Sequence, residues 1–161
     1  MKTVNITFPE EYHPSKSAIH AHNELFIPAS SNTIWYWLIN ATSWPEWYPN
    51  SANVEILNQE NNSHLTENSK FNWRTFNTNI QSEVKEFEEN KRLAWVANGS
   101  GLLAYHSWLI IEKDDGCLVV TEETQRGFLP RLFGFFIKKG LLKQHQIWLE
   151  GLRKKAIVQS V

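Results

Sequence analysis

The sequence predicts a single α+β domain in which an antiparallel sheet of about seven strands curves around one long C-terminal helix. Three observations lead to this prediction. The length of 161 residues suits one domain, and no linker or repeat divides the chain. Residues 51–127 alternate between apolar and polar side chains and are interrupted by turn residues, which is typical of successive strands. Residues 130–156 instead follow helical spacing.

The first part of the chain is expected to hold one strand and little else of regular structure. Residues 1–17 are polar and contain prolines, so we expect a poorly ordered N-terminal arm. The single domain then spans residues 18–158. A strand is expected over residues 19–28, where the first continuous apolar alternation occurs.

Three helices are expected, two short and one long. Ser30 and its neighbours offer N-cap side chains for a short helix over residues 33–40. Pro45 suits the first turn of a second short helix, which Pro49 would end. The long helix over residues 130–156 is amphipathic. Its apolar side holds Ile137, Leu141, His145, Trp148, Leu149 and Leu152.

The strands can be aligned by following one sheet face through the short turns. A two-residue turn pairs an odd-numbered residue with an even-numbered one, so the parity of the covered face switches at each turn. Turns are expected at residues 77–78, 89–90, 98–101 and 114–116. The covered face then collects Phe71, Trp73, Thr75, Ile80, Ser82, Val84, Glu86, Leu93, Trp95, Ala97, Ala104, His106, Trp108, Ile110, Val119, Thr121, Glu123 and Gln125.

Composition excludes several classes of protein. Sixteen Lys and Arg residues against seventeen Asp and Glu residues give no excess of cations, so we expect no nucleic-acid partner. The longest apolar runs are too short to cross a bilayer. A single cysteine, Cys117, rules out a disulfide framework, and no signal-peptide pattern follows Met1, so we expect a cytoplasmic protein. We predict no cofactor. The oligomeric state stays open between monomer and homodimer.

Aromatic residues are abundant, with eight Trp, nine Phe and four Tyr. Each buried aromatic side chain removes about 150–250 Å² from water. Two interpretations stay open: an unusually aromatic core, or a partly hollow interior whose walls recognise an apolar or planar ligand.

Several short segments together resemble a known family. They are Ile27-Pro28-Ala29, Trp44-Pro45-Glu46-Trp47, Phe71-x-Trp73-Arg74-Thr75, Ser82-x-Val84-x-Glu86, Arg92-Leu93-Ala94-Trp95, His106-x-Trp108 and Trp148-Leu149-Glu150. In this order they resemble the START/birch-pollen-allergen superfamily (SRPBCC), in particular its polyketide cyclase/dehydrase and lipid-transport-like branch. The resemblance implies a helix-grip fold with a deep hydrophobic cavity between sheet and helix. It does not imply one chemistry, because relatives include both carriers and enzymes.

The predicted function is binding of a hydrophobic or amphipathic small molecule, lipid-, polyketide- or aromatic-like, by a carrier or sensor. We expect the cavity walls to be formed by Trp73, Thr75, Val84, Trp95, Trp108, Ile137, Leu141 and Trp148. The polar end of the cavity is expected to hold Ser82, Glu86, His106, Glu123 and His145. These polar residues could alternatively form a structural hydrogen-bond network. A second alternative is a cyclase or dehydratase in which His106 and Glu123 act as acid and base.

Two other features of the sequence concern its histidines and an unusually apolar segment. His20 and His22 lie on one side of a strand, with His13 nearby, but no carboxylate or cysteine at ligand spacing accompanies them, so we predict no metal site. The segment Gly127–Ile137 is apolar almost all round and is followed by lysines. It could be covered by the tryptophan-rich short helices, form a protein or dimer contact, or touch a membrane surface transiently.

Overall fold

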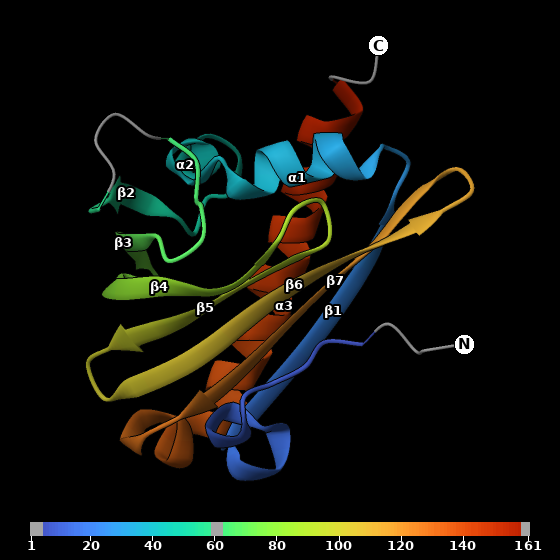
Figure 1. The fold of residues 1–161 in the computed structure, drawn as a ribbon. Coiled ribbons are helices and arrows are strands. Elements are labelled where there is room, and N and C mark those ends of the chain that lie inside the picture. The colour runs from blue at the N-terminus through green and yellow to red at the C-terminus, as the bar shows by residue number, and fades with distance from the viewer. Residues whose placement is uncertain (1–4, 59–62, 159–161) are drawn as a thin grey trace.

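The computed structural model describes residues 5–58 and 63–158, and it shows one antiparallel sheet wrapped around a long helix (Figure 1). The strands are β1 (Ile19–Ile27), β2 (Ala52–Ile56), β3 (Lys70–Thr75), β4 (Thr78–Glu88), β5 (Arg92–Gly99), β6 (Leu102–Lys113) and β7 (Gly116–Arg126). The helices are α1 (Ser31–Ile39), α2 (Trp44–Trp47) and α3 (Phe128–Val158), with 3₁₀ turns η1 (Glu10–Tyr12), η2 (Pro14–Lys16) and η3 (Ala41–Ser43). The predicted fold class is confirmed.

The strand order explains how two short helices come to close one end of the molecule. The seven strands follow the order β1-β7-β6-β5-β4-β3-β2, and every neighbouring pair is antiparallel. The chain must therefore travel from one edge of the sheet, at β1, to the other edge, at β2. Helices α1 and α2 make this crossing and contact α3 on the way (Figure 1). Among the described residues, none of the helices is long and apolar enough to cross a membrane.

The register of the central strands agrees with the predicted covered face. Phe76 and Asn77 form a two-residue turn with φ values of 49° and 57°, one residue earlier than the sequence suggests. This is the backbone that tight hairpins favour. Trp95 pairs with His106, which in turn pairs with Glu123, so these three residues lie side by side on the inner face.

One residue on the predicted covered face, Glu86, is misplaced. Val84 pairs with Trp95, whereas Glu86 pairs with Ala94, so a β-bulge interrupts β4 between them. A bulge adds one residue to one strand and reverses its inward and outward alternation beyond that point. Phe87 consequently faces inward and contacts Trp35, with ring centroids 5.1 Å apart. Glu86 faces outward, and the prediction for this residue is wrong.

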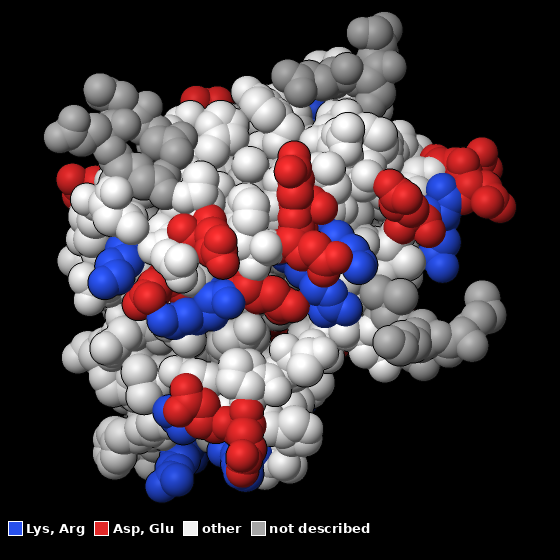
Figure 2. Space-filling view, viewed as in Figure 1, with Lys and Arg blue, Asp and Glu red and all other residues white. Residues whose placement is uncertain are grey.

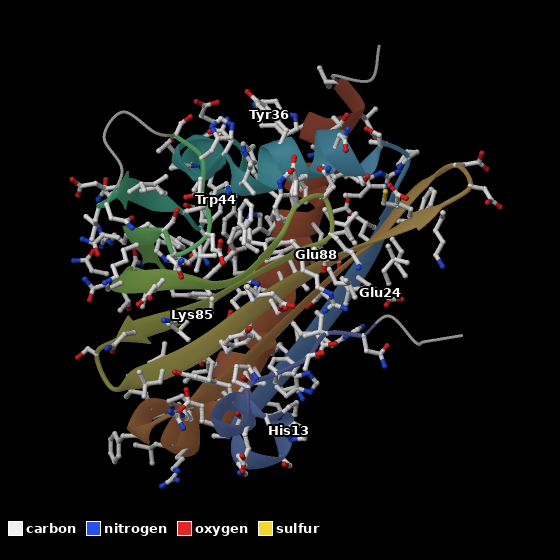
Figure 3. All side chains as sticks on the ribbon, viewed as in Figure 1. His13, Glu24, Tyr36, Trp44, Lys85 and Glu88 are labelled. Carbon is white, nitrogen blue, oxygen red and sulfur yellow. The ribbon has the colours of Figure 1, made fainter. Side chains whose placement is uncertain are left out.

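Trp44 is the centre of an aromatic core that holds the layers together. It is fully buried, and it is labelled in Figure 3. Its ring lies 5.5 Å from that of Trp73, 5.7 Å from Trp95 and 5.1 Å from Trp148. Its indole N–H donates a hydrogen bond to the Leu38 carbonyl at 3.1 Å. The short crossing segment, the sheet and α3 therefore meet in one cluster of rings.

Helix α3 is longer than predicted and is interrupted near its start. Phe133 has φ −118° and ψ 18°, which is not a helical conformation, and Gly134 follows it. At the other end, an added Cβ at Gly151 would come within 2.6 Å of the Trp47 carbonyl oxygen. Gly134 thus adjoins the break in the helix, and Gly151 permits close packing of the helix backbone against Trp47.

Residues 5–17 pack against the outer face of the sheet, where the sequence predicts a poorly ordered arm. Tyr12 is buried, with its ring 5.6 Å from that of Tyr105. The Thr124 hydroxyl donates to the Tyr12 carbonyl at 2.8 Å. Tyr105 is an aromatic residue on the solvent side of a strand, and the N-terminal segment removes it from water. Residues 1–4 lie outside the described part of the chain.

The apolar start of α3 is not covered by the short helices. Trp47 lies against Gly151, and Tyr48 stacks on Trp148, so the tryptophan-rich segment packs on the C-terminal half of α3. Phe135 and Phe136 are 78% and 73% exposed. Of the three interpretations of this segment, coverage by the short helices is therefore wrong.

Close packing at Gly151 predicts a clear contrast between two substitutions on α3. Gly151→Ala should lower the free energy of unfolding by about 1–3 kcal/mol, because the new methyl group meets the Trp47 backbone. At Gly140 the nearest atom to an added Cβ, on Phe76, is 3.8 Å away. Gly140→Ala should therefore stabilise the protein by up to about 1 kcal/mol through helix propensity. Urea unfolding measures both, and equal effects at the two sites would contradict the packing argument.

Candidate functional site

A cavity of about 390 Å³ lies between the inner face of the sheet and α3. Its lining includes exposed residues at one end, such as Phe76, Leu129 and Phe136, and buried residues at the other, such as His106 and Glu123. The exposed residues mark the mouth, which the β3–β4 turn and the start of α3 surround. The walls between are almost entirely apolar.

Six of the eight predicted wall residues line this cavity. They are Trp73, Thr75, Trp95, Ile137, Leu141 and Trp148. Val84 and Trp108 do not line it, although both face inward as predicted and are buried. Trp108 is screened because the His106 ring stacks on it, with centroids 5.4 Å apart. These two residues belong to the core beside the cavity.

Three of the five predicted polar residues meet at its buried end. Glu123 extends from β7, His106 from the adjacent β6, and His145 from α3. The His145 Nε2 lies 3.2 Å from Glu123 Oε2, and His106 Nδ1 lies 3.3 Å from the same oxygen. Gln125 donates from Nε2 to Glu123 Oε1 at 2.6 Å. The His106 Nε2 is hydrogen-bonded to the Thr121 hydroxyl at 2.8 Å.

The other two predicted polar residues lie elsewhere. Ser82 is buried, and its hydroxyl accepts a hydrogen bond from the Trp73 indole N–H at 3.1 Å. Glu86 lies beyond the bulge on the outer face, where its carboxylate is 3.6 Å from the Arg92 guanidinium. Neither side chain lines the cavity.

Sequence reasoning missed several lining residues, of which Tyr48 is the most informative. Tyr48 follows α2, lines the cavity and stacks on Trp148 with centroids 4.4 Å apart. Its position after Trp47 and before Pro49 gives only a local turn signal. Gln125 could have been found, because its parity places it on the inner face. Phe76 at the mouth carries no pattern that distinguishes it from a surface residue, and the apolar pattern around Phe136 does not indicate that it borders the cavity.

A match to a protein-family model identifies the family of this chain. The model of the family described as polyketide cyclase/dehydrase and lipid transport matches residues 18–156. The chain belongs to this family. A search of curated proteins gave no match.

Solved structures show the same fold for this member of the polyketide cyclase/dehydrase and lipid transport family. The hypothetical protein jhp0584 from Helicobacter pylori is 30% identical over 97% of this chain and 99% of that chain, with a TM-score of 0.88. A START superfamily protein from Mycobacterium smegmatis is 16% identical over 87% and 98% of the two chains, with a TM-score of 0.72. The Zhui aromatase/cyclase from a Streptomyces species is 10% identical over 88% and 95%, with a TM-score of 0.76. The fold is the helix-grip fold of the START superfamily.

The electrostatics of this family member's polar cluster follow from its burial. Removal from water lowers the pKa of His106 to about 3, against the opposing attraction of Glu123. Burial alone would raise the pKa of Glu123, but the hydrogen bonds from His145 and Gln125 lower it below its usual range. At neutral pH the cluster therefore holds an ionised Glu123 beside a neutral His106.

The cluster places potential metal-ligand atoms of His106, Glu123 and His145 within 4.8 Å of one another. Two imidazoles and a carboxylate are a set that transition metals accept. However, the two imidazole rings are stacked, with centroids 4.7 Å apart and planes 28° apart. A ring nitrogen binds a metal in the plane of its ring, so these rings would have to reorient to share one ion. The observed geometry suits hydrogen bonding better.

The histidines of β1 lie on the outer face of the sheet, away from the cavity. His20 Nε2 is 2.6 Å from one carboxylate oxygen of Glu122, and His22 Nδ1 is 3.0 Å from the other. Carboxylates thus accompany these histidines, contrary to the sequence prediction: Glu122 comes from the neighbouring strand β7, and Glu24 of β1 itself lies 3.3 Å from His22 Nε2. Acidic and basic side chains are interspersed on this face (Figure 2). His13, labelled in Figure 3, is hydrogen-bonded to Ser15 instead.

We expect acid to destabilise this family member through His106. Its pKa near 3 in the folded state contrasts with about 6.5 in an unfolded chain. Below about pH 6.5 the unfolded state binds a proton that the folded state excludes, so the free energy of unfolding falls by up to about 1.4 kcal/mol per pH unit. Glu123 adds to this loss only at lower pH, because its folded-state pKa is lowered from 4.5.

Urea unfolding between about pH 7 and about pH 5 tests this expectation. The variant His106→Gln cannot be protonated there and should lose less stability over the same interval than the wild type. An identical loss in both proteins would show that His106 is not the responsible group.

Proposed function

We propose that this protein binds an amphipathic small molecule whose neutral, hydrogen-bond-donating end meets Glu123. The observation that carries the proposal is the buried carboxylate at the closed end of an apolar cavity. Such a carrier or sensor would hold its ligand between the sheet and α3. The family description and the likeness to START proteins support ligand binding of this kind.

The size and lining of the cavity favour a flat or aliphatic ligand. About 390 Å³ lies within the range of ordinary small-molecule sites. Trp73, Trp95 and Trp148 present large ring surfaces along the walls. Transfer of apolar ligand surface from water to these walls supplies the main driving force, at about 25 cal/mol per Å².

The polar end favours a hydroxyl or an uncharged amine over an acid. Glu123 is ionised, and among the described residues it accepts hydrogen bonds from Gln125 and His145, while His106 Nδ1 lies 3.3 Å from its Oε2. A carboxylate has about four acceptor sites, so it can accept a further donor from a ligand. A ligand carboxylate would instead face a like charge in an apolar environment, which costs several kcal/mol.

Catalysis of the cyclase or dehydratase type is the second candidate, because the similar structures include the Zhui aromatase/cyclase. In this alternative His106 and Glu123 would exchange a proton with the substrate. Efficient proton transfer requires a pKa near the working pH. The pKa values of both residues are lowered, which makes each a weak base. The electrostatics therefore favour binding over turnover.

A matched pair of ligands tests the proposed selectivity. The neutral fluorescent probe N-phenyl-1-naphthylamine should bind in the cavity. At neutral pH, 2-naphthol should displace this probe with an affinity at least about tenfold higher than that of 2-naphthoate. Glu123→Gln removes the charge and should reduce the difference in affinity between the two competitors. Equal affinity for the two competitors in the wild type, or an unchanged difference in the variant, would contradict the role of Glu123.

A second pair of variants tests whether the probe occupies the cavity. Ala97 lines it, so Ala97→Phe should fill part of the space and weaken probe binding at least about tenfold. Val96 is the preceding residue of β5 and faces the other side of the sheet, beside the Tyr12 and Tyr105 cluster. Val96→Phe adds its bulk outside the cavity and should leave probe affinity unchanged. Equal weakening by both variants would place the probe elsewhere.

A further inference from the structure

We propose that the start of α3 is a docking surface for an anionic lipid membrane, from which the ligand enters the cavity. The entry of the ligand rests on the proposed function, whereas the docking itself rests on an exposed apolar patch and the cations around it. The apolar patch consists of Phe128, Leu132, Phe133, Phe135 and Phe136, each at least 47% exposed. Five large apolar side chains on one short segment are more than a monomer ordinarily leaves in water.

The charges around the apolar patch are all of one sign along the helix. Residues 126–149 contain five cations, Arg126, Arg131, Lys138, Lys139 and Lys143, and no Asp or Glu, although the whole chain has a net charge of −1. Arg126 pairs with Glu11 at 3.7 Å. In the described part of the chain, the other four form no ion pair with a carboxylate. Glu10, in the nearby η1 turn, is already paired with Lys16 at 2.6 Å.

Helical geometry places lysines on the same side as the phenylalanines. At 100° per residue, Lys139 and Lys143 fall between the directions of Phe135 and Phe136. Leu141 and His145 point the opposite way, into the protein. Long lysine side chains beside an apolar patch can lie along it and place their ammonium groups at the level of lipid phosphates.

The apolar patch also adjoins the mouth of the cavity. Phe136 belongs to both, and its neighbours Leu129, Pro130 and Ile137 line the cavity. The non-helical residue Phe133 lies within the patch. A ligand leaving the bilayer at this surface would reach the apolar walls without crossing water.

A second copy of the chain fits this surface less well than a membrane does. In a two-fold dimer the same patch meets itself, so Arg131, Lys138 and Lys139 of one copy would approach those of the other. Like charges brought together in this way oppose association. Anionic headgroups complement the same cations, and acyl chains complement the phenylalanines.

Co-sedimentation with lipid vesicles tests the proposal. The wild-type protein should sediment with vesicles of phosphatidylcholine containing about one-third phosphatidylglycerol, less with phosphatidylcholine alone, and less at high salt. Phe128→Ser/Phe135→Ser and Lys139→Glu/Lys143→Glu should each weaken binding at least about tenfold. None of these four residues lines the cavity.

Two residues on other surfaces, Tyr36 and Lys85, serve as matched controls, and both are labelled in Figure 3. Tyr36 is 43% exposed on α1, and Lys85 lies on the outer face of β4, paired with Glu83. Tyr36→Ser and Lys85→Glu should bind anionic vesicles as the wild type does. Absence of vesicle binding by the wild type, or equal losses in the patch and control variants, would overturn the proposal. A dimer in size-exclusion chromatography that Phe128→Ser/Phe135→Ser dissociates, without vesicle binding, would also overturn it in favour of self-association.

Binding of N-phenyl-1-naphthylamine without vesicles separates this proposal from the proposed function. Probe binding without vesicle binding would overturn the docking surface and leave the cavity's function intact. Vesicle binding without probe binding would support the docking surface and contradict the function of the cavity. Phe128→Ser/Phe135→Ser should retain probe affinity, since it alters only the docking surface.

Discussion

The buried carboxylate of Glu123 is the constraint on which the arrangement of the two layers depends. An ionised group in an apolar interior is tolerated only when hydrogen-bond donors surround it. One donor, Gln125, lies two residues along the same strand and therefore on the same face. Another, His145, comes from α3. The hydrogen bond from His145 thus adds a polar constraint on the rotation of the helix to the aromatic packing around Trp148.

The two halves of α3 play different physical roles. Its C-terminal half is fixed by aromatic packing, where Trp148 contacts Trp44 and Tyr48 and the backbone approaches Trp47 at Gly151. Its N-terminal half carries exposed phenylalanines and borders the cavity mouth. The abundance of aromatic residues accordingly has two explanations that hold together. Some rings fill the core, and others form the walls of a partly hollow interior.

Burial of the polar end affects both the basicity of its side chains and the charge of the ligand that it can accept. The same removal from water that keeps His106 neutral makes it a poor proton acceptor. The hydrogen bonds that keep Glu123 ionised weaken it as a base in the same way. The proposed selectivity for neutral over anionic ligands rests on the same burial. Its position at the end of an apolar cavity suits molecules that dissolve poorly in water.

The sequence by itself determined most of the inner face and the buried side of the long helix. Alternation along strands, carried through two-residue turns, was enough to bring Trp95, His106 and Glu123 together, because side-chain direction in a strand is a local property. Helical spacing likewise placed His145 on the buried side of α3. The family resemblance correctly indicated the helix-grip fold.

Only the tertiary structure decided the features that depend on distant segments. The bulge that turns Glu86 outward is a property of the pairing between β4 and β5. Glu122 reaches His20 from a strand about one hundred residues later, and Tyr48 enters the cavity because the crossing segment packs on α3. The N-terminal turns cover Tyr105 on the outer face, while the start of α3 stays uncovered. Periodicity reports which side of an element a residue occupies, but which segment covers that side is settled by contacts across the whole chain.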